Sequence, residues 1–368
     1  MSKIISIATA IPEHKHEQKS ILHFMQQVYS LNNDDTRKLN FLYNKSGINT
    51  RYSTIVDYSV EQNKWEFYPK SIKNENFPSL EKRMQWYQYH AAKLSVNAIN
   101  DCINTYEVAS DITHLITVSC TGMSAPGLDL EIIELMNLPR SIYRTSVNFM
   151  GCYAAIHALK MADAICKNEC NAKVVIVCTE LCTLHFQNEA TEDNLTASML
   201  FSDGAAAVLV TADSNSNKGL FLKGFYSEVI PNGKKDMSWQ LSSSGFLMTL
   251  SGYVPNLIEK DFEQLVTNAL QKNDVDIKSI SHWCIHPGGK RILDTICKSL
   301  KLNNSELNES YDVLKNYGNM SSPTILFVLK NIMHSLESNA YKNENKNIFG
   351  AAFGPGLTME TFIVTPNA

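Results

Sequence analysis

The hydrophobic and polar positions of this chain form short apolar runs that alternate with longer amphipathic segments. The runs that we expect to form buried strands lie at residues 3–11, 114–120, 144–150, 173–179, 205–210, 221–229, 282–286 and 348–364, the last being a strand, a turn and a strand. Apolar residues recur at helical spacing at residues 17–45, 80–106, 127–137, 152–165, 255–272, 290–301 and 321–338. Residues 55–80, which are aromatic-rich but polar, predict an irregular surface segment. Uninterrupted apolar strands are typical of sheets covered on both faces, so the alternation predicts an α/β fold with a mixed sheet between helix layers.

The second part of this pattern repeats the theme of the first. A polar, Ser- and Asn-rich stretch at residues 211–220 is the best candidate boundary, and it divides the chain into residues 1–215 and 216–368. Cys152 and Asn319 each follow a glycine at the expected start of a helix. A duplicated fold would place these two residues at facing helix starts.

Composition and charge exclude some classes of function. The chain has 368 residues, of which 44% are hydrophobic and 19% charged, which is the balance of a globular protein with a large core. Its net charge of -4 gives no electrostatic argument for nucleic acid or an anionic membrane, so we expect small molecules or proteins as partners. The opening apolar run is too short for a signal peptide, and no run approaches the roughly 20 residues of a membrane span. We therefore expect no membrane span and a cytoplasmic location.

The chain has nine cysteines, and several fall inside apolar runs. An odd number in such positions predicts free thiols in a reducing compartment. Cys166 with Cys170 and Cys178 with Cys182 have a spacing that suggests a metal site, but no CxxC or CxxH pattern accompanies them. We therefore expect no metal.

Cys152 is the strongest candidate for a nucleophile. It sits at a Gly151-Cys152 corner between an apolar strand and a helix with a small apolar face. Unpaired N–H groups and the helix dipole at such a corner favour thiolate over thiol, so we expect the pKa of Cys152 to lie below the usual value of about 8.5. The alternative is a buried structural cysteine before an ordinary core helix.

Two further glycine-marked polar motifs accompany it, His286-Pro-Gly-Gly and Tyr317-Gly-Asn-Met-Ser-Ser. Cysteine, histidine and asparagine suffice for acyl chemistry on thioesters. The thiolate takes up the acyl group, the imidazole of His286 stabilises it, and donors on His286 and Asn319 hold a developing enolate or oxyanion. His286 can instead be a buried turn residue, and Asn319 a helix N-cap.

Five motifs together resemble the type III polyketide synthases, the chalcone synthase-like family. They are Met150-Gly-Cys-Tyr-Ala-Ala, Leu200-Phe-Ser-Asp-Gly-Ala-Ala-Ala, His286-Pro-Gly-Gly, Tyr317-Gly-Asn-Met-Ser-Ser and Phe353-Gly-Pro-Gly-Leu-Thr, in the family's order and spacing. Pro78-Ser-Leu-Glu-Lys-Arg-Met and Ser119-Cys-Thr-Gly look more like the bacterial alkylpyrone and alkylresorcinol synthase branch than the plant branch. The resemblance covers essentially the whole chain.

The resemblance implies a thiolase fold, a duplicated α-β-α-β-α layered architecture with mixed five-stranded sheets, in a homodimer. It also implies iterative decarboxylative condensation of malonyl-CoA onto an acyl starter, with CoA thioesters as substrates and no further cofactor. Cys152 would be the nucleophile, and His286 and Asn319 the donors for malonyl decarboxylation. The implied substrate-binding residues are the gatekeeper Phe201, Met248 in place of a second gatekeeper phenylalanine, the cavity positions Cys120, Ala125, Cys182, His185 and Ser321, and the CoA-binding Lys38 and Lys45.

Two departures from the family pattern affect the substrates that we expect. Met248 replaces a rigid ring by a flexible thioether and should loosen the throat for a fatty-acyl starter that ends as a pyrone or resorcinol. Phe41 replaces an arginine between Lys38 and Lys45, which leaves an acyl-carrier protein as an alternative to acyl-CoA. A third departure, Ala352 in place of a glycine, should leave the Gly-Pro-Gly loop intact.

Two alternatives stay open beside this interpretation. One is a single-round initiating β-ketoacyl synthase of the same fold, although in those enzymes Gln-Ala usually follows the histidine that Pro-Gly-Gly follows here. The other is a catalytically silent thiolase-fold binding protein, which would not release CO2 from malonyl-CoA.

Overall fold

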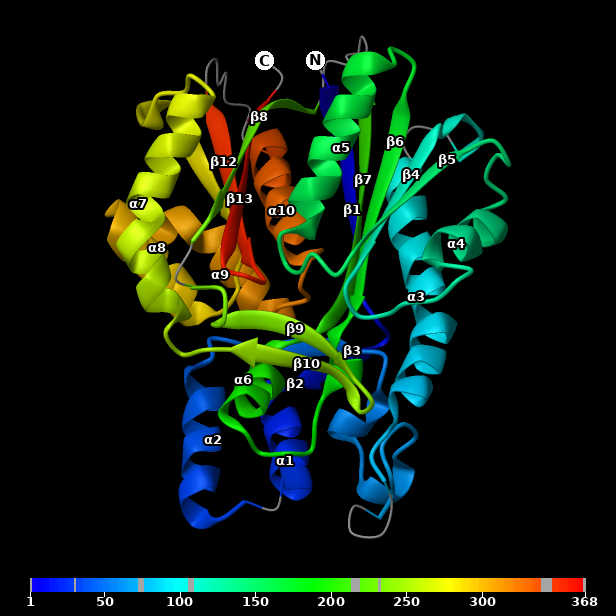
Figure 1. Ribbon diagram of the computed structural model, residues 1–368, viewed down its shortest axis with the longest axis vertical. Coiled ribbons are helices and arrows are strands. Elements are labelled where there is room, and N and C mark those ends of the chain that lie inside the picture. The colour runs from blue at the N-terminus through cyan, green and yellow to red at the C-terminus, as the bar shows by residue number, and fades with distance from the viewer. Residues whose placement is uncertain are drawn as a thin grey trace.

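The computed structural model describes residues 2–29, 31–71, 76–104, 109–212, 219–230, 233–338 and 346–366. Its main feature is a nine-stranded mixed sheet with the order β11-β12-β13-β8-β1-β7-β6-β4-β5 (Figure 1). The strands of this sheet are β1 (Ser2–Ala10), β4 (His114–Ser119), β5 (Tyr143–Asn148), β6 (Lys173–Leu181), β7 (Asp203–Ala212), β8 (Leu220–Val229), β11 (Ile280–Ile285), β12 (Asn347–Gly354) and β13 (Thr358–Pro366).

The sheet is made of two groups of strands that meet at a seam. Strands β5, β4, β6, β7 and β1 come from the first half of the chain, and β8, β13, β12 and β11 from the second. The groups join where β1 and β8 pair antiparallel, Lys3 with Phe221 and Ile4 with Leu220. We expected five strands in each half, but the described second half supplies four. The two groups form one sheet because the free N–H and C=O groups of an open edge pair readily with another edge. The predicted boundary at residues 215 and 216 lies outside the described residues.

Helices pack against both faces and between the two halves (Figure 1). The central pair is α5 (Ala154–Asn168) and α10 (Thr324–Ser338). The outer face of the first half carries α3 (Leu80–Ile103) and α4 (Leu128–Met136), and that of the second half carries α7 (Val254–Lys272) and α8 (Lys290–Leu300), with α9 (Asn308–Tyr317) beside α8 and α10.

The cores confirm the five-layer α-β-α-β-α architecture. Successive side chains of a strand point to opposite faces. Leu115 of β4 packs in the core under α3, whereas its neighbour Ile116 packs in the central core with α5 and α10. In the second half, Ile348 of β12 faces the central core and Phe349 faces the core under α7 and α8. The continuous apolar runs of the sequence therefore exist because each strand is covered on both faces.

A smaller subdomain lies at one end of the molecule and takes elements from both halves of the chain (Figure 1). It contains the helices α1 (Gln18–Tyr29), α2 (Asn33–Lys45) and α6 (Glu192–Leu200), the paired strands β2 (His14–Glu17) and β3 (Thr50–Ser53), and the hairpin of β9 (Met237–Ser242) and β10 (Gly245–Leu250). The prediction of a surface segment at residues 55–80 was wrong for its aromatic residues. Trp65, Phe67 and Tyr68 are buried, because the carboxylate of Asp57 accepts three backbone N–H groups and folds the segment onto α1.

Strand β5 also departs from the prediction of a buried strand. It is the outermost strand of the sheet, and most of its residues are exposed in the single chain, including Tyr143. A sequence pattern does not distinguish an edge strand from a central strand.

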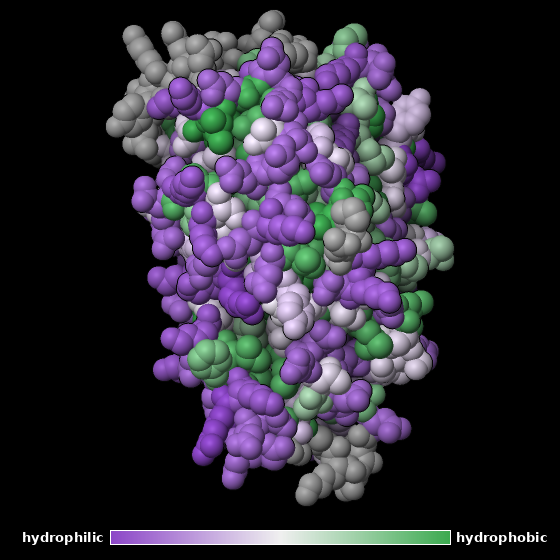
Figure 2. Space-filling model, turned by 60° about the vertical axis from the view of Figure 1, so that its left-hand side comes forward, coloured by the Kyte–Doolittle hydropathy of each residue, from purple (hydrophilic) through white to green (hydrophobic). Residues whose placement is uncertain are grey.

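The surface seen in Figure 2 is largely hydrophilic, with hydrophobic residues in small groups. Of the helices in the described ranges, none is long and apolar enough to cross a membrane.

Candidate active site

The turn from β5 to α5 carries Cys152, two residues before the helix begins at Ala154. Gly151 has a φ of +83°. A Cβ atom added to Gly151 would lie 2.2 Å from Cδ of Pro355, a residue of the Gly-Pro-Gly loop. Only glycine therefore fits this turn, and the loop braces the segment that presents the partly exposed thiol.

The prediction of a low pKa for Cys152 is wrong for the site as it stands. Burial raises the pKa of the thiol to about 11, and hydrogen bonds from Ser321 and Asn319 lower it by less. Burial also lowers the pKa of His286 to about 3. Cys152 precedes the first turn of α5 instead of occupying it, and a dehydrated pocket disfavours charge. The thiol and the imidazole are both neutral at rest.

His286 directly follows the last residue of β11. Its backbone N–H donates to the carbonyl of Ala351, and its own carbonyl accepts the N–H of Gly288, each over 2.9 Å. The side chain is 2% exposed, and both ring nitrogens are buried without a hydrogen-bond partner. Because buried polar groups are normally paired, the imidazole has a donor and an acceptor available for a ligand.

Asn319 lies in the segment between α9 and α10. Its Oδ1 accepts the backbone N–H of Ser321 over 2.8 Å and lies 3.5 Å from the hydroxyl of Thr324, which donates to the Ser321 carbonyl. Its Nδ2 is the only donor of the side chain, and the hydrogen bond from Asn319 to Cys152 lowers the thiol pKa. Oδ1 of Asn319 therefore stabilises the turn, while Nδ2 faces Cys152. Asn319 lies five residues before α10 begins, so it is not the N-cap of that helix.

The three residues meet in one pocket, which we call the catalytic pocket. It is lined by Cys152, Leu200, Phe201, Met237, Met248, Leu250, His286, Gly288, Ile292, Asn319 and Phe353. Phe201 and Met248 also line a second pocket, which we call the inner pocket. The backbone of Phe201 is tied to that of Asn319, since Ser202 N–H donates to the Asn319 carbonyl over 2.9 Å and Asn319 N–H donates to the Leu200 carbonyl over 3.0 Å. Phe201 and Met248 thus line both pockets, and their role as a gate stays a prediction.

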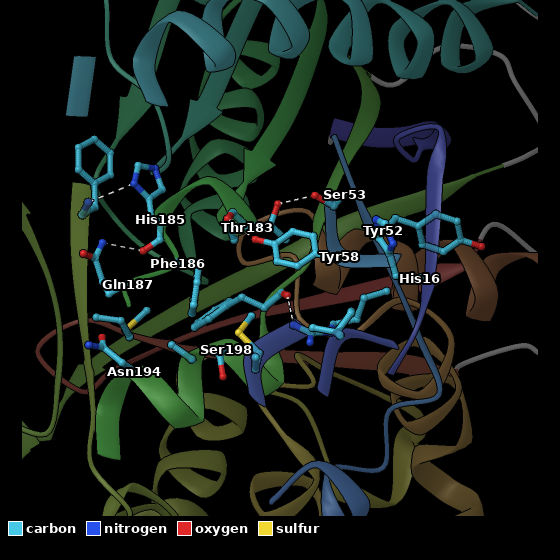
Figure 3. A pocket seen from close by; sticks show the side chains of 18 of the residues that line it. His16, Tyr52, Ser53, Tyr58, Thr183, His185, Phe186, Gln187, Asn194 and Ser198 are labelled. Carbon is cyan, nitrogen blue, oxygen red and sulfur yellow. Dashed lines mark hydrogen bonds between the residues drawn. The ribbon is translucent and has the colours of Figure 1, made fainter. Parts of the chain in front are cut away.

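The inner pocket lies among β3, α1, α6, the short helix Cys182–His185 and the β9–β10 hairpin (Figure 3). Its apolar lining comprises Ile21, Met25, Phe186, Ala197, Phe201, Trp239, Phe246 and Met248. The space between atoms amounts to about 580 Å³, open solvent included. This lining suits an apolar chain better than a polar substrate.

His185 is held from two sides in the wall of the inner pocket. Its Nε2 lies 2.8 Å from the carbonyl oxygen of Thr121. Its Nδ1 lies 3.1 Å from the backbone nitrogen of Phe246, the contact drawn as a dashed line at the His185 ring in Figure 3. A carbonyl accepts and an N–H donates, so the ring is neutral and protonated on Nε2. Burial lowers its pKa to about 3. His185 therefore fixes the wall, and the protein uses both of its nitrogens.

The other predicted binding residues divide into two sets. Cys182 lines the inner pocket, Cys120 Sγ accepts the N–H of Gly151 over 3.0 Å from behind the nucleophile turn, and Ser321 hydrogen-bonds to Cys152. Ala125, Lys38 and Lys45 line neither pocket and are exposed in the single chain. Lys38 pairs with Asp35 over 3.3 Å on the surface of α2.

Sequence reasoning missed the β9–β10 hairpin as a wall of the site. Trp239 donates from Nε1 to the carbonyl of Cys120 over 2.7 Å, and Phe246 stacks on His185 with ring centroids 4.2 Å apart. Two apolar-rich stretches around the turn Ser242-Ser-Ser-Gly245 are a hairpin signal that could have revealed it.

Glu180, at the end of β6, was missed as well. It is fully buried beside the nucleophile turn and accepts hydrogen bonds from the N–H of Cys120, the hydroxyl of Thr121 and the hydroxyl of Ser322. Burial raises its pKa to about 7. No local pattern marks a glutamate in an apolar strand as a residue of this site.

Comparisons with known proteins cover the whole chain. The family models described as Chalcone and stilbene synthases, N-terminal domain, and Chalcone and stilbene synthases, C-terminal domain, match residues 1–214 and 222–366. Type III polyketide synthase C of Arabidopsis thaliana is 27% identical over 375 residues, which cover 98% of this chain and 94% of that protein. Probable polyketide synthase 1 of Dictyostelium discoideum is 27% identical over 367 residues, which cover 98% of this chain and 11% of that protein.

Solved structures match over the full length. The C-terminal type III polyketide synthase domain of Steely1, a type I/III hybrid from Dictyostelium, has a TM-score of 0.90 at 26% identity, with 100% of this chain and 99% of that chain covered. PKS-I from the brown alga Ectocarpus siliculosus has a TM-score of 0.92 at 24% identity, with 99% and 98% covered, and this likeness supports the fold alone. These relatives come from a plant, Dictyostelium and a brown alga, so the affinity to the bacterial branch stays a prediction.

Proposed function

The chain belongs to the chalcone and stilbene synthase family and is a type III polyketide synthase, a condensing acyltransferase, and from this premise we propose that it extends a fatty-acyl starter with malonyl-CoA. The observation that carries the proposal is the apolar inner pocket, which shares Phe201 and Met248 with the catalytic pocket. An acyl group on Cys152 has a path past these two side chains into apolar surroundings.

Loading begins with Cys152. Its sulfur attacks the starter thioester carbonyl, the C–S bond to the carrier breaks, and the carrier leaves as a thiol. The thiol proton of Cys152 passes to the unprotonated ring nitrogen of His286 and from there to the leaving sulfur. Because both groups are neutral at rest, the charge pair exists only while this transfer takes place.

Extension uses the same donors. The bond between the malonyl α-carbon and its carboxylate breaks, CO2 leaves, and the electron pair forms an enolate on the thioester. An N–H of His286 and the Nδ2–H of Asn319 donate to the enolate oxygen. The enolate carbon then attacks the acyl-cysteine carbonyl and releases the sulfur of Cys152, which leaves the lengthened chain as a β-keto thioester of CoA. For the next round the sulfur of Cys152 attacks the thioester carbonyl of this chain, the C–S bond to CoA breaks, and CoA leaves as the thiol. Cyclisation yields a pyrone or a resorcinol.

The proposed enzyme is a homodimer that takes its starter from CoA or from an acyl-carrier protein. Strand β5 supports the dimer, because it is an exposed edge with Tyr143 67% exposed and Leu135 of the adjoining α4 53% exposed. Phe41, 64% exposed between Lys38 and Lys45 on α2, supports a donor that needs fewer basic contacts than plant-type CoA binding does. Light scattering of the purified protein measures its molar mass and thereby tests whether it is a dimer.

The deciding experiment incubates the enzyme with malonyl-CoA and acyl-CoAs of graded chain length, with products identified by mass spectrometry. Since each buried methylene contributes about 0.8 kcal/mol, kcat/KM should rise with chain length until the inner pocket is full. A flat profile, or an aromatic CoA ester that outperforms every aliphatic one, refutes the fatty-acyl starter. A product with a single added unit identifies a single-round synthase instead, and no CO2 release from malonyl-CoA identifies a binding protein.

A further inference from the structure

Arg51 of β3 is a buried cation that the reaction described above does not use. Its side chain is 3% exposed and lines the inner pocket. Nε donates to Oε1 of Gln18 over 2.8 Å, and Nη1 donates to the carbonyl of Phe201 over 2.6 Å. Nη2 is buried without any hydrogen-bond partner. The guanidinium therefore keeps one donor free beside the gate residue Phe201.

Arg51 forms no ion pair within the part of the chain that the structure describes, although its guanidinium carbon lies 5.9 Å from the centre of the Tyr43 ring. Burial lowers the pKa of Arg51, and Tyr43, Tyr58 and the more weakly acting Asp203 raise it by less. The oxygens of Asp203 accept from Thr54 and Thr183 instead of forming an ion pair with the guanidinium. A buried cation without an ion-pair partner and with an unpaired N–H group is costly, so Nη2 of Arg51 calls for an explanation.

A comparison with His286 suggests an explanation for the unpaired Nη2 of Arg51. In the described ranges, the buried side-chain nitrogens without a partner are the two ring nitrogens of His286 and Nη2 of Arg51. His286 faces the catalytic pocket, where substrate oxygen is its proposed partner. Arg51 faces the pocket on the other side of Phe201 and Met248. Both unpaired donors thus lie along the path of one acyl chain.

The position of Arg51 fixes which part of that chain it meets. Its Cγ and Cδ pack on Gly318, where an added Cβ would lie 3.0 and 3.1 Å away, and Gly318 precedes Asn319. Nη1 holds the carbonyl of Phe201. Each extension leaves the newest carbonyl on Cys152 and moves the earlier ones toward the gate, while the alkyl end goes deeper. The first oxygens to pass Phe201 are therefore β-keto oxygens.

We propose that Nη2 of Arg51 donates to a keto or enolate oxygen of the growing β-keto chain once that oxygen has passed the gate. Arg51 is then a positioning residue that holds the extended chain in the inner pocket and sets how many units are added before release. Ser53 and Thr183, which Figure 3 labels in the same pocket, already hydrogen-bond to each other, whereas Nη2 of Arg51 has no partner among the described residues. The inference rests on the proposed iterative extension.

Binding tests it without turnover. In a Cys152→Ala background, calorimetry compares dodecanoyl-N-acetylcysteamine with its β-oxododecanoyl counterpart. A charge-assisted hydrogen bond should make the β-oxo ligand bind about tenfold or more tightly, and Arg51→Lys, which has one terminal nitrogen where arginine has two, should abolish the preference. Thr211→Val is the matched control, because Thr211 Oγ1 is also buried and unpaired but lines neither pocket of the site. It should keep the preference.

Turnover provides the second readout. With dodecanoyl-CoA and malonyl-CoA, Arg51→Lys should release products with fewer extensions, and this shift in product length should persist when the amounts are normalised to the rate at which Cys152 is loaded. Equal binding of both ligands to the Arg51-containing protein overturns the proposal even if no Arg51 variant folds. A preference for an ω-hydroxydodecanoyl ligand over the β-oxo ligand also overturns it, because the partner would then be the end of the starter. Failure of the unmodified enzyme to make any polyketide refutes the proposed function, and the binding result still decides on Arg51.

Discussion

Replacing Asn319 by alanine separates the two functions that the structure assigns to this side chain. The substitution removes the Nδ2 donor at Cys152 and also the Oδ1 acceptor for the N–H of Ser321, at 2.8 Å. Loss of the donor should slow malonyl decarboxylation about 10²- to 10³-fold, the effect of one lost oxyanion donor. Loss of the acceptor leaves a buried N–H unpaired and should cost about 1–3 kcal/mol of the free energy of unfolding.

A matched variant isolates the second effect. Thr324 shapes the same turn, since its hydroxyl donates to the Ser321 carbonyl over 2.8 Å and accepts the N–H of Met320 over 2.9 Å. Thr324→Val should destabilise the turn by a similar amount while the Asn319 amide stays in place. If turn damage alone slows decarboxylation, the two variants should behave alike.

Three assays read out the effects. Intact-protein mass spectrometry measures acylation of Cys152, release of labelled CO2 from malonyl-CoA measures decarboxylation, and urea titration measures stability. We expect Asn319→Ala to accept the starter at close to the normal rate and to lose decarboxylation, and Thr324→Val to keep both. Equal losses of loading and decarboxylation in Asn319→Ala, matched by Thr324→Val, would refute the donor role and leave Asn319 a structural residue.

Three further outcomes follow from the same geometry. Met248→Phe or Met248→Trp should narrow the gate and lower kcat/KM for long acyl-CoAs while sparing short ones, and an unchanged ratio of long to short substrates in steady-state assays would contradict the gate. Since burial raises the pKa of Cys152 to about 11, its alkylation by iodoacetamide should accelerate about tenfold per pH unit between pH 7 and pH 10. At pH 7 the exposed Cys170 should react first in peptide mapping. Rapid labelling of Cys152 at a rate independent of pH would show a resting thiolate instead. Because the pKa of Glu180 is raised to about 7, the folded state binds its proton more tightly than the unfolded state does, so stability should fall as pH rises from about 4.5 to about 7, by roughly 3 kcal/mol at most. Glu180→Gln should remove that fall in urea titrations at pH 5 and pH 8, and an equal fall in both proteins would assign it to other groups.

The local sequence was enough for most elements and for singling out three residues that the structure brings together in one pocket. Apolar runs predicted β1, β4, β6, β7 and β11 because the period of a strand and its cover of helices are visible in neighbouring residues. Glycines marked the turns at Cys152 and Asn319 because backbone constraints at Gly151 and Gly318, both with positive φ, leave no other choice. The motif order then implied the thiolase fold, which the matches to solved structures confirm.

What only the tertiary structure decided depends on burial and on partners far apart in the sequence. The neutral thiol of Cys152 follows from exclusion of water by residues of both halves, which no local pattern reveals. Strand β5, Tyr-Arg-Thr-Ser-Val-Asn, was predicted to be buried as part of the segment that leads to the Cys152 corner, yet in the single chain it is an exposed edge. The unpaired nitrogen of Arg51 becomes visible only in the folded chain, where the carbonyl of Phe201, 150 residues away, accepts from Nη1 and no group among the described residues accepts from Nη2. Sequence determines which residues can form strands, turns and nucleophiles, whereas protonation, access and unmet hydrogen bonds are properties of the space that the folded chain encloses.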